Sequence, residues 1–414
     1  MSSYADGGDV AETAAVVAGI ARDLELVDHH CHQLVAGPLG GDRFERLLGE
    51  GAFAAPAGCS AADTGLGLAV RALCAPVLDL PVGAGIAEYV ERRAELGTDE
   101  VHRRLMSGGA STYLVDTGYA PDELCSVDQM AGWTGGRVAE VARLETLAER
   151  VATHTFWDGG TGRTGEGGAV PNRAIAARMA GRAARTYAER LEEEMEKCRG
   201  VSGWKSVAAY RCGLGLDWSR PGPAQVREAA REWLSAEPDR QGRWRLENPV
   251  LIAHGVWAAL DSGLPVQFHT GFGDNDVRLA SADPTLLDPL IRATADGRSP
   301  IMLLHCWPYH RQAGYLAMVW PHVYMDVGLA IPHAGHRAAA ILAEALELAP
   351  WHKVLYSSDA FGLAELYHLG VGLWREALAS VLQPLSSAGF GNEELVRLGS
   401  LVGSGNALRV YGLD

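Results

Sequence analysis

Short apolar segments recur along the chain, and most of them are followed by longer stretches with helical periodicity. A run of four to eight apolar residues is typical of a buried strand, whereas apolar residues spaced three or four apart are typical of a helix. Alternation of the two indicates βαβ units with parallel strands. The pattern predicts strands at residues 24–28, 112–116, 141–145, 201–210, 264–269, 300–305, 322–327 and 353–358.

These units favour an α/β fold, a TIM-like (β/α)8 barrel, with an open doubly wound sheet as the competing architecture. The stretch 392–410 predicts a closing helix that begins after Asn392 as its N-cap. Other helices are expected where Ala, Leu and Glu recur with helical period, at residues 172–198, 223–235, 249–262, 284–296, 335–349 and 363–384.

The connection after the first strand is too long for one βα unit. Its Ala/Leu pattern predicts several helices at about 36–110, which we expect to form a helical cap inserted after strand 1. The chain 1–414 is then a single barrel domain. A Gly-rich stretch at 156–170 contains a formal GxGxxG match at 160–165. It follows no convincing strand, so a surface loop is preferred to a dinucleotide site.

The composition is that of an ordinary globular protein, with 414 residues, of which 48% are hydrophobic and 21% charged. The net charge of −15 argues against a nucleic-acid partner and an anionic membrane surface. No segment approaches the ~20 apolar residues of a membrane span, and the N-terminus does not resemble a signal peptide. Seven cysteines without CxxC pairs are typical of buried thiols in a reducing compartment. We therefore expect a cytoplasmic protein.

Two histidines, His30 and His32, follow the first predicted strand. Side chains at i and i+2 of an extended chain point to the same side, with Cα atoms ~6–7 Å apart, so both can approach one metal ion. In a barrel the chemistry lies at the C-terminal ends of the strands, and three other predicted strands end in His269, His305 and Asp359. Each histidine alone is more often a hydrogen-bonded core or loop residue. Five such groups at four strand ends predict a site for Zn²⁺ or a similar divalent ion.

Several neighbouring residues admit two interpretations. His29 is expected to alternate away from the ligand candidates and to form hydrogen bonds behind the strand. Asp28 is expected either to orient those histidines or to be a plain turn residue. Arg211, after the fourth strand, is expected either to bind a substrate carboxylate in bidentate fashion or to form a surface ion pair. Trp307 and Tyr309 are expected to floor an apolar pocket or to pack beneath the cap.

The order of these groups along the chain resembles the amidohydrolase superfamily, and within it the amidohydrolase-2 branch. More specifically, the chain resembles the domain that is fused to glutamine synthetase in FluG-like and nodulin-like proteins. The likeness spans about residue 20 to the end. It is carried by KSVAAYR at 205–211, FHTGFGD at 268–274 and YSSDA at 356–360, with weaker support from RLE at 143–145 and GNALR at 405–409.

The resemblance implies that His30, His32, His269 and Asp359 hold the metal. Zinc is the expected ion, with manganese or iron as alternatives. Such an ion lowers the pKa of bound water from 15.7 to about 7. By similarity, Asp359 accepts the proton of the attacking water and passes it to the leaving group, while His305 polarises the scissile carbonyl.

Lys205 raises the question of a second ion. In the two-metal branches of the superfamily a carboxylated lysine on strand 4 bridges the ions, and His305 becomes a ligand by analogy. Because the fourth strand is expected to run through Tyr210, Lys205 would lie ~20 Å before Arg211, too deep to bridge. We therefore favour one ion and a buried, paired Lys205, with a second ion as the alternative.

The expected reaction is hydrolysis of a C–N bond in a small amide that bears a carboxylate. The association of relatives with glutamine synthetase suggests a γ-glutamyl amide. The alternatives are a non-oxidative decarboxylase or uronate-isomerase-like enzyme, and a non-catalytic barrel that keeps a metal for binding. We expect a small-molecule substrate, no nucleic-acid or membrane partner, and a homodimer in which the apolar helices of 36–110 offer an interface.

Overall fold

The structure, a computed structural model, has a parallel sheet of seven strands at its centre, paired in the order β1 to β7 along the chain. Each strand pairs with the strands that come directly before and after it in the chain, as in a (β/α)8 barrel. The structure describes residues 7–157 except 52, 54, 120 and 122, and residues 173–413 except 199. The Gly-rich stretch at 158–170, with its GxGxxG match, lies outside the described residues.

The seven strands lie where the apolar pattern predicts them, with shifts at their ends. β2 agrees with the prediction at both ends, whereas β1 begins three residues later and includes His29 and His30. The strands are β1 (Val27–Cys31), β2 (Thr112–Asp116), β3 (Arg137–Arg143), β4 (Gly203–Ser206), β5 (Val266–His269), β6 (Ile301–Leu304) and β7 (Val323–Met325).

The eighth predicted strand forms an irregular segment that closes the sheet. Val354 makes a parallel bridge with Met325 of β7. On the other side, the amide of His29 donates to the carbonyl of Tyr356 (3.2 Å), and the amide of Asp359 donates to the carbonyl of His30 (3.0 Å). We call residues 354–360 the closing segment. It joins β7 to β1, so the predicted barrel is confirmed.

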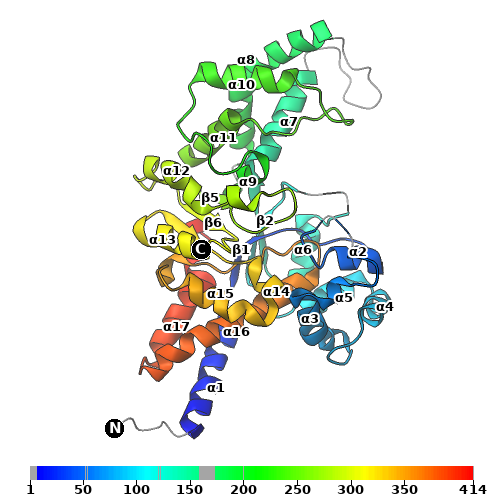
Figure 1. The fold of residues 1–414 in the computed structure, drawn as a ribbon, viewed down its shortest axis with the longest axis vertical. Helices are drawn as coiled ribbons and strands as arrows, with labels where there is room; N and C mark the ends of the chain where they lie inside the picture. Colours follow the sequence, from blue (N-terminus) through cyan, green and yellow to red (C-terminus); the bar gives the residue numbers. More distant parts are fainter. Residues whose placement is uncertain are drawn as a thin grey trace.

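The helices extend from the barrel in two directions. Figure 1 shows α7, α8, α10 and α11 projecting from one end, while α2 to α5 lie together beside the sheet. The helices are α1 (Gly7–Asp23), α2 (Gly41–Arg46), α3 (Gly65–Ala69), α4 (Ile86–Leu96), α5 (Thr98–Met106), α6 (Val127–Thr134), α7 (Leu144–Trp157), α8 (Arg173–Lys197), α9 (Ala208–Arg211), α10 (Pro223–Ser235), α11 (Pro249–Asp261), α12 (Asp288–Ala293), α13 (His310–Val319), α14 (Ala330–Ala334), α15 (Ala338–Ala345), α16 (Ala364–Ser387), α17 (Asn392–Ser400) and α18 (Asn406–Tyr411).

The predicted closing helix at 392–410 is divided in three. A π-helical turn, η8 (Leu401–Gly405), separates α17 from α18. The N-cap is Gly391 rather than Asn392, which is the first helical residue, so that prediction is wrong by one position. Gly403 allows the turn to approach the chain just before β1, because a Cβ at this position would lie 2.9 Å from the carbonyl of Glu25.

The segment 36–110 is helical, as predicted, and a buried ion pair fastens it to the barrel. Arg93 of α4 pairs with Glu365 of α16, and the Tyr89 hydroxyl donates to the same carboxylate (2.9 Å). Both charged side chains are almost fully buried, and removal of one would leave the other without compensation. The role of the whole segment as a cap stays a prediction.

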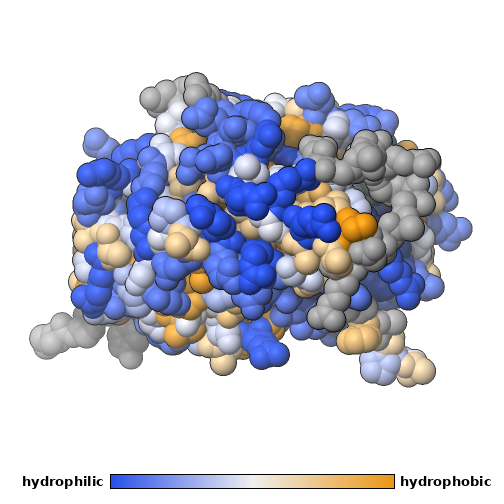
Figure 2. All heavy atoms as spheres, turned by 90° about the horizontal axis from the view of Figure 1, so that it is seen from above, coloured by the Kyte–Doolittle hydropathy of each residue, from blue (hydrophilic) through white to orange (hydrophobic). Residues whose placement is uncertain are grey.

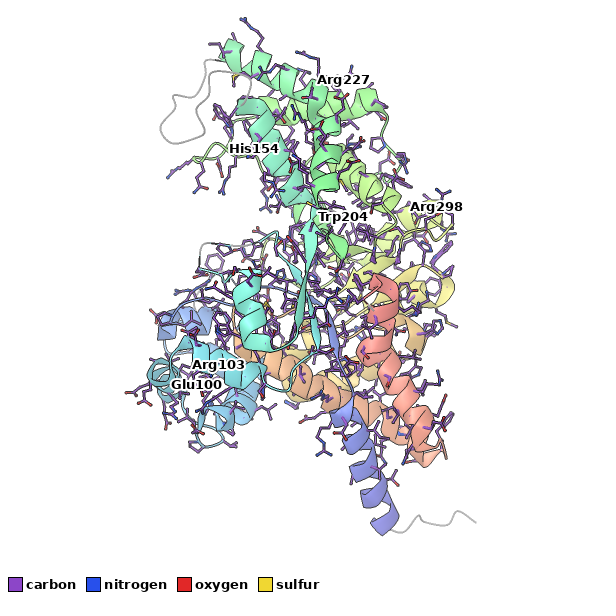
Figure 3. The ribbon with its side chains drawn as sticks, turned by 180° about the vertical axis from the view of Figure 1, so that it is seen from behind. Glu100, Arg103, His154, Trp204, Arg227 and Arg298 are labelled. Carbon is purple, nitrogen blue, oxygen red and sulfur yellow. The ribbon has the colours of Figure 1, made fainter. Side chains whose placement is uncertain are left out.

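The helical projection joins the barrel next to β4. Trp204, labelled in Figure 3, is buried at this junction, and its indole N–H donates to the Ser262 hydroxyl (2.9 Å) at the end of α11. From above, the molecule presents a largely hydrophilic surface with scattered apolar side chains (Figure 2). None of the described helices is long and apolar enough to cross a membrane. The cysteines are free thiols, but Cys59 and Cys212 are exposed, in contrast to the expectation that all are buried.

Candidate metal centre

Imidazole and carboxylate groups meet at the C-terminal ends of the strands. The Nε2 atom of His30 lies 3.1 Å from Oδ1 of Asp359, and Nδ1 of His305 lies 3.2 Å from Oδ2. The Nε2 atom of His32 lies 3.6 Å from Oδ1 of the same carboxylate. The His269 ring packs 4.8 Å from the His305 ring, centroid to centroid. The structure thus brings together all five groups that were predicted at the strand ends.

The orientation of His30 is set by a glutamine. Its Nδ1 atom lies 2.8 Å from the Gln267 carbonyl oxygen, while the Gln267 amide nitrogen donates to the His29 carbonyl (2.8 Å). Because a carbonyl oxygen only accepts, His30 carries its proton on Nδ1 and presents the Nε2 lone pair to Asp359. A lone pair 3.1 Å from a carboxylate oxygen is favourable only if positive charge lies beside both; the Lys205 ammonium, 3.3 Å from this Nε2 atom, supplies one such charge, and a metal ion would supply another.

Three buried polar atoms of the cluster have no hydrogen-bond partner among the described residues: Nε2 of His269, Nδ1 of His305 and Oδ1 of Asp359. Such atoms are rare in folded proteins, because each loses its hydration without compensation. Two or more imidazoles with one carboxylate are the donors that Zn²⁺ and similar ions prefer. The donor set therefore fits a divalent ion.

The protonation states also suit metal binding, which requires neutral imidazoles. Burial, with a further effect of the Lys205 ammonium, lowers the pKa of His30 to about 4. Burial likewise holds the pKa of His269 and of His305 well below the ordinary value. Burial acts to raise the pKa of Asp359, but His305, His30 and His32 outweigh it and keep that pKa well below its usual range.

Two of these residues have left-handed backbone conformations, with φ of 61° at His305 and 49° at Asp359. Such conformations are uncommon for residues other than glycine and are found at functional sites. The His305 amide is held by Oδ1 of Asp326 (3.0 Å). Asp28 holds the segment beside Asp359, because its carboxylate accepts from the amide and hydroxyl of Ser358 (2.9 and 2.5 Å). Asp28 thus orients the closing segment rather than a histidine.

Lys205 lies in the cluster, so the prediction that it is too deep in the barrel is wrong. Its Nζ atom is 3.3 Å from Nε2 of His30 and 3.4 Å from Nε2 of His305. β4 ends at Ser206 because Glu145, the second residue of α7, accepts from the Ser206 hydroxyl and from the Val207 amide (2.7 and 3.0 Å). The chain then turns into α9 instead of continuing as a strand. The distance argument against a second ion therefore no longer holds.

The cluster forms the floor of a cavity of about 470 Å³. His32, Lys205, His269, His305 and Asp359 line its inner end. Its walls come from loops that follow several strands and from the chain just after α2. They include Arg43, Glu50, Tyr119, Arg143, Tyr210, Arg211, Arg245, Asp274 and Phe361.

Of the three predicted substrate contacts, only Arg211 lines the cavity. Arg211 lines the cavity but belongs to α9, and its Nη1 atom donates to Glu149 (2.7 Å). Trp307 packs its ring against Phe272, with centroids 5.9 Å apart, and the Tyr309 hydroxyl donates to a backbone carbonyl. Neither residue is among those that line the cavity, and their partners Phe272 and Leu279 belong to the chain after β5 and not to 36–110, so both roles stay predictions.

Sequence reasoning missed several residues that shape the site. Tyr210 stacks on His269 with ring centroids 4.4 Å apart. Asp116, at the end of β2, accepts hydrogen bonds from Arg143 (2.6 Å at Nη2), and its backbone carbonyl orients His32 (3.2 Å). Asp116 also stands at a strand end, the signal on which the predicted ligands were chosen, and could have been included on that ground.

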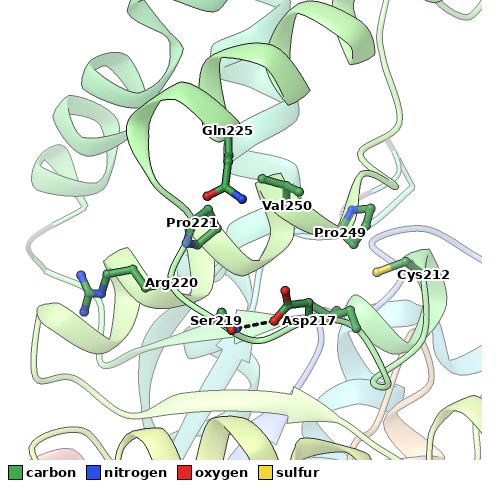
Figure 4. A pocket seen from close by; sticks show the side chains of 9 residues that line it. Cys212, Asp217, Ser219, Arg220, Pro221, Gln225, Pro249 and Val250 are labelled. Carbon is green, nitrogen blue, oxygen red and sulfur yellow. Dashed lines mark hydrogen bonds between the residues drawn. The ribbon is translucent and has the colours of Figure 1, made fainter.

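A second cavity, of about 290 Å³, lies between the chain after α9 and the start of α11 (Figure 4). Its lining includes Cys212, Gln225 and Arg220, and Arg220 is engaged by Asp261 in a bidentate ion pair (2.6 Å for each bond). It contains none of the clustered histidines. The candidate site is therefore the cavity that the histidine cluster lines.

The chain is similar to known proteins along its whole length. It matches a metal-dependent hydrolase of Lactobacillus casei over 96% of this chain and 97% of that one, with a TM-score of 0.75 and 24% identity. It matches the glucuronate isomerase of Caulobacter crescentus over 99% and 96%, with a TM-score of 0.59 and 14% identity. At these identities both likenesses concern the fold.

Sequence comparison gives the family. The FluG protein of Emericella nidulans is 30% identical over 226 residues, which are 52% of this chain and 26% of that protein, so the chain covers about a quarter of its relative's length. Residues 170–413, more than half of the chain, match the family described as amidohydrolase. The match includes the positions of His269, His305 and Asp359. The chain belongs to the amidohydrolase family.

Proposed function

We propose that this protein is a metal-dependent hydrolase that cleaves the C–N bond of a small, carboxylate-bearing amide, with a γ-glutamyl amide as the substrate. One observation carries the proposal. Buried atoms of His269, His305 and Asp359 have no hydrogen-bond partners in the described structure, and all three residues line a cavity large enough for a small molecule.

His30, His32, His269 and Asp359 would hold the ion, for which we propose zinc. When bound, a divalent ion activates water and polarises a carbonyl group. Lys205 and His305 lie beside these residues and are the positions at which a second ion would be held. The number of ions follows from elemental analysis of the purified protein.

Two residues of the chain then have separate roles, one toward the attacking water and one toward the carbonyl oxygen. Asp359 is ionised and accepts a proton from the attacking water. His305 is neutral and buried, and it donates to the carbonyl oxygen as negative charge develops there. The Asp326 carboxylate accepts a hydrogen bond from the His305 backbone amide (3.0 Å), which keeps the imidazole in place to donate this hydrogen bond.

Arg211 would bind the substrate carboxylate. A guanidinium has five N–H donors, and the hydrogen bond to Glu149 uses one of them while fixing the orientation of the group. Arg211→Met should raise KM for a carboxylate-bearing amide and leave KM for its neutral analogue nearly unchanged. An equal rise for both substrates would contradict this role.

The proposal is tested with zinc-loaded protein and a panel of γ-glutamyl amides. We expect release of free amine and glutamate that stops on chelation and returns with zinc. Matched amides without the carboxylate should react more slowly. No amine from any member would refute the proposal, CO₂ release from an acid would favour a decarboxylase, and conversion of a uronate would favour an isomerase. Full metal content without any turnover would favour a binding barrel.

A further inference from the structure

Glu50 borders the same cavity from the chain that follows α2. Its side chain is 32% exposed, and the cavity lies on its open side. In the described part of the chain, no arginine or lysine lies within ion-pair distance of it. Its neighbour is His333, whose Nε2 atom lies 3.6 Å from the Glu50 Oε1 atom.

The arginine side chains around the cavity are engaged elsewhere. Arg43 pairs with Glu123, Arg143 with Asp116, Arg211 with Glu149, and Arg245 with Glu247 and Asp276. The groups that act on Glu50 are instead the carboxylates of Asp359 and Asp274. Burial first, and then these two carboxylates, raise the pKa of Glu50 to about 8.

His333 gives an independent indication of the same protonation state. Its Nδ1 atom lies 2.9 Å from the Leu329 carbonyl, which only accepts, so the proton of a neutral ring is on Nδ1. Burial lowers the pKa of His333, which favours the neutral ring. The Nε2 lone pair then faces Glu50, and it has no hydrogen-bond partner among the described residues. A lone pair suits a carboxylic acid O–H and opposes a carboxylate.

Glu45, in the same segment, is an example of a glutamate with a structural role. Its Oε2 atom accepts from the Ser60 hydroxyl and from the Ala61 amide (2.7 and 3.2 Å), which ties α2 to the next turn. Glu50 makes no such bond to its own segment in the described structure. Its carboxyl group is therefore available to a molecule in the cavity.

We propose that Glu50 is a second acid–base residue of this site and donates the proton that the departing amine takes up, with His333 as its positioning residue. This inference rests on the proposed amide hydrolysis. It assigns the two proton transfers to two carboxyl groups on different elements, since Asp359 lies on the closing segment and Glu50 on the segment inserted after β1.

The proton balance closes over one turnover. Water forms the new C–O bond at the carbonyl carbon and gives a proton to the Asp359 carboxylate. The Glu50 carboxyl gives its proton to the nitrogen as the C–N bond breaks, so a neutral amine and a carboxylic acid leave. The proton on Asp359 then returns to Glu50 through water, which restores both groups.

The test compares Glu50→Gln with Glu45→Gln on two substrates that differ in their leaving group. An alkylamide needs a proton donor, whereas an activated nitroanilide does not. We expect Glu50→Gln to lower kcat by roughly 10²–10⁴-fold on the alkylamide and by much less on the nitroanilide. Glu45→Gln should retain kcat on both. Equal losses on both substrates in Glu50→Gln would overturn the donor role.

A second readout is independent of turnover. Infrared difference spectra of wild type minus Glu50→Gln should show a protonated carboxyl band at neutral pH that is lost as pH rises through about 8. The kcat of the wild type on the alkylamide should fall over the same range, because the donor becomes ionised. A carboxylate band at neutral pH would overturn the inference. If wild type cleaves no amide, the proposed function and the donor role fail together, while the infrared band still reports the protonation of Glu50.

Discussion

His29 and His30 are consecutive residues of one buried strand, yet their surroundings differ in one decisive way. Both ring nitrogens of His29 have protein partners: Nε2 lies 3.0 Å from Asp326 and Nδ1 lies 3.0 Å from the Tyr411 hydroxyl. His30, by contrast, has one nitrogen held by Gln267 and the other directed at Asp359 and Lys205. We call His29 and its partners the closed layer. We call His30 and the groups around its free nitrogen the open layer, because a ligand can be bound there.

The protons of the closed layer can be assigned throughout. His29 donates from Nε2 to the Asp326 carboxylate and accepts at Nδ1 from the Tyr411 hydroxyl, whose oxygen accepts from the Gln267 amide (2.8 Å). Satisfied networks of this kind make the interior rigid. The open layer above it also contains histidine and aspartate, but Nε2 of His269, Nδ1 of His305 and Oδ1 of Asp359 have no hydrogen-bond partner among the described residues. The partners, and not the residue types, therefore distinguish a structural histidine from a candidate ligand.

The largest effect is expected from replacing His30, and the replacement of its neighbour His29 is the matched control. His30→Asn removes a ligand, so metal content and activity should both fall to the level of metal-free protein. His29→Asn should keep its metal, while its free energy of unfolding falls by about 1–3 kcal/mol, because the partners in the closed layer lose their hydrogen bonds. Elemental analysis and chemical denaturation measure both. Loss of metal in both variants would remove the distinction between the layers.

His305→Asn separates one ion from two. With one ion, metal content should stay nearly unchanged while kcat falls by roughly 10²–10³-fold, as when a single oxyanion donor is lost. With two ions, the variant should lose about half of its metal, since Lys205 and His305 then both serve as ligands. The measurement is metal per chain for wild type and variant, with His269→Asn as the control that loses a ligand in either case.

Chelation should lower the stability only of those proteins whose open layer holds an ion. Removal of an ion held at a free concentration about 1,000-fold above its Kd costs about 4 kcal/mol of stability, so the wild-type Tm should fall. His30→Asn should hardly respond to the chelator, whereas His29→Asn should respond like wild type. An unchanged wild-type Tm after complete metal removal would contradict the view that the cluster requires an ion.

The smallest effect is expected from Tyr411→Phe, which removes one hydroxyl from the closed layer. We expect a loss of about 1–3 kcal/mol in the free energy of unfolding, with metal content retained and kcat little changed. Because Gln267 keeps its bond to the His29 carbonyl (2.8 Å), it should continue to orient His30. A loss of metal here would show that the two layers are coupled more tightly than their separate partners indicate.

The barrel and the five groups at the strand ends can be predicted from the amino-acid pattern alone. Apolar runs and helical periodicity are local properties, and parallel strands in a barrel necessarily bring their C-terminal ends together. His30, His32, His269, His305 and Asp359 were therefore identified without any knowledge of distances. The same reasoning predicted that His29 forms hydrogen bonds behind the strand, which the contacts with Asp326 and Tyr411 confirm.

Where each strand stops and which residues complete the cavity depend on contacts between distant parts of the chain. Glu145, about 60 residues earlier in the chain, ends β4 and brings Lys205 into the cluster. Gln267 lies on β5, four strands along the sheet from β1, which carries the histidine that it orients. Glu50 reaches the cavity from an insertion whose local pattern indicates only helices. Each of these contacts joins residues far apart in sequence, and no local periodicity encodes such a contact because it depends on how the elements pack.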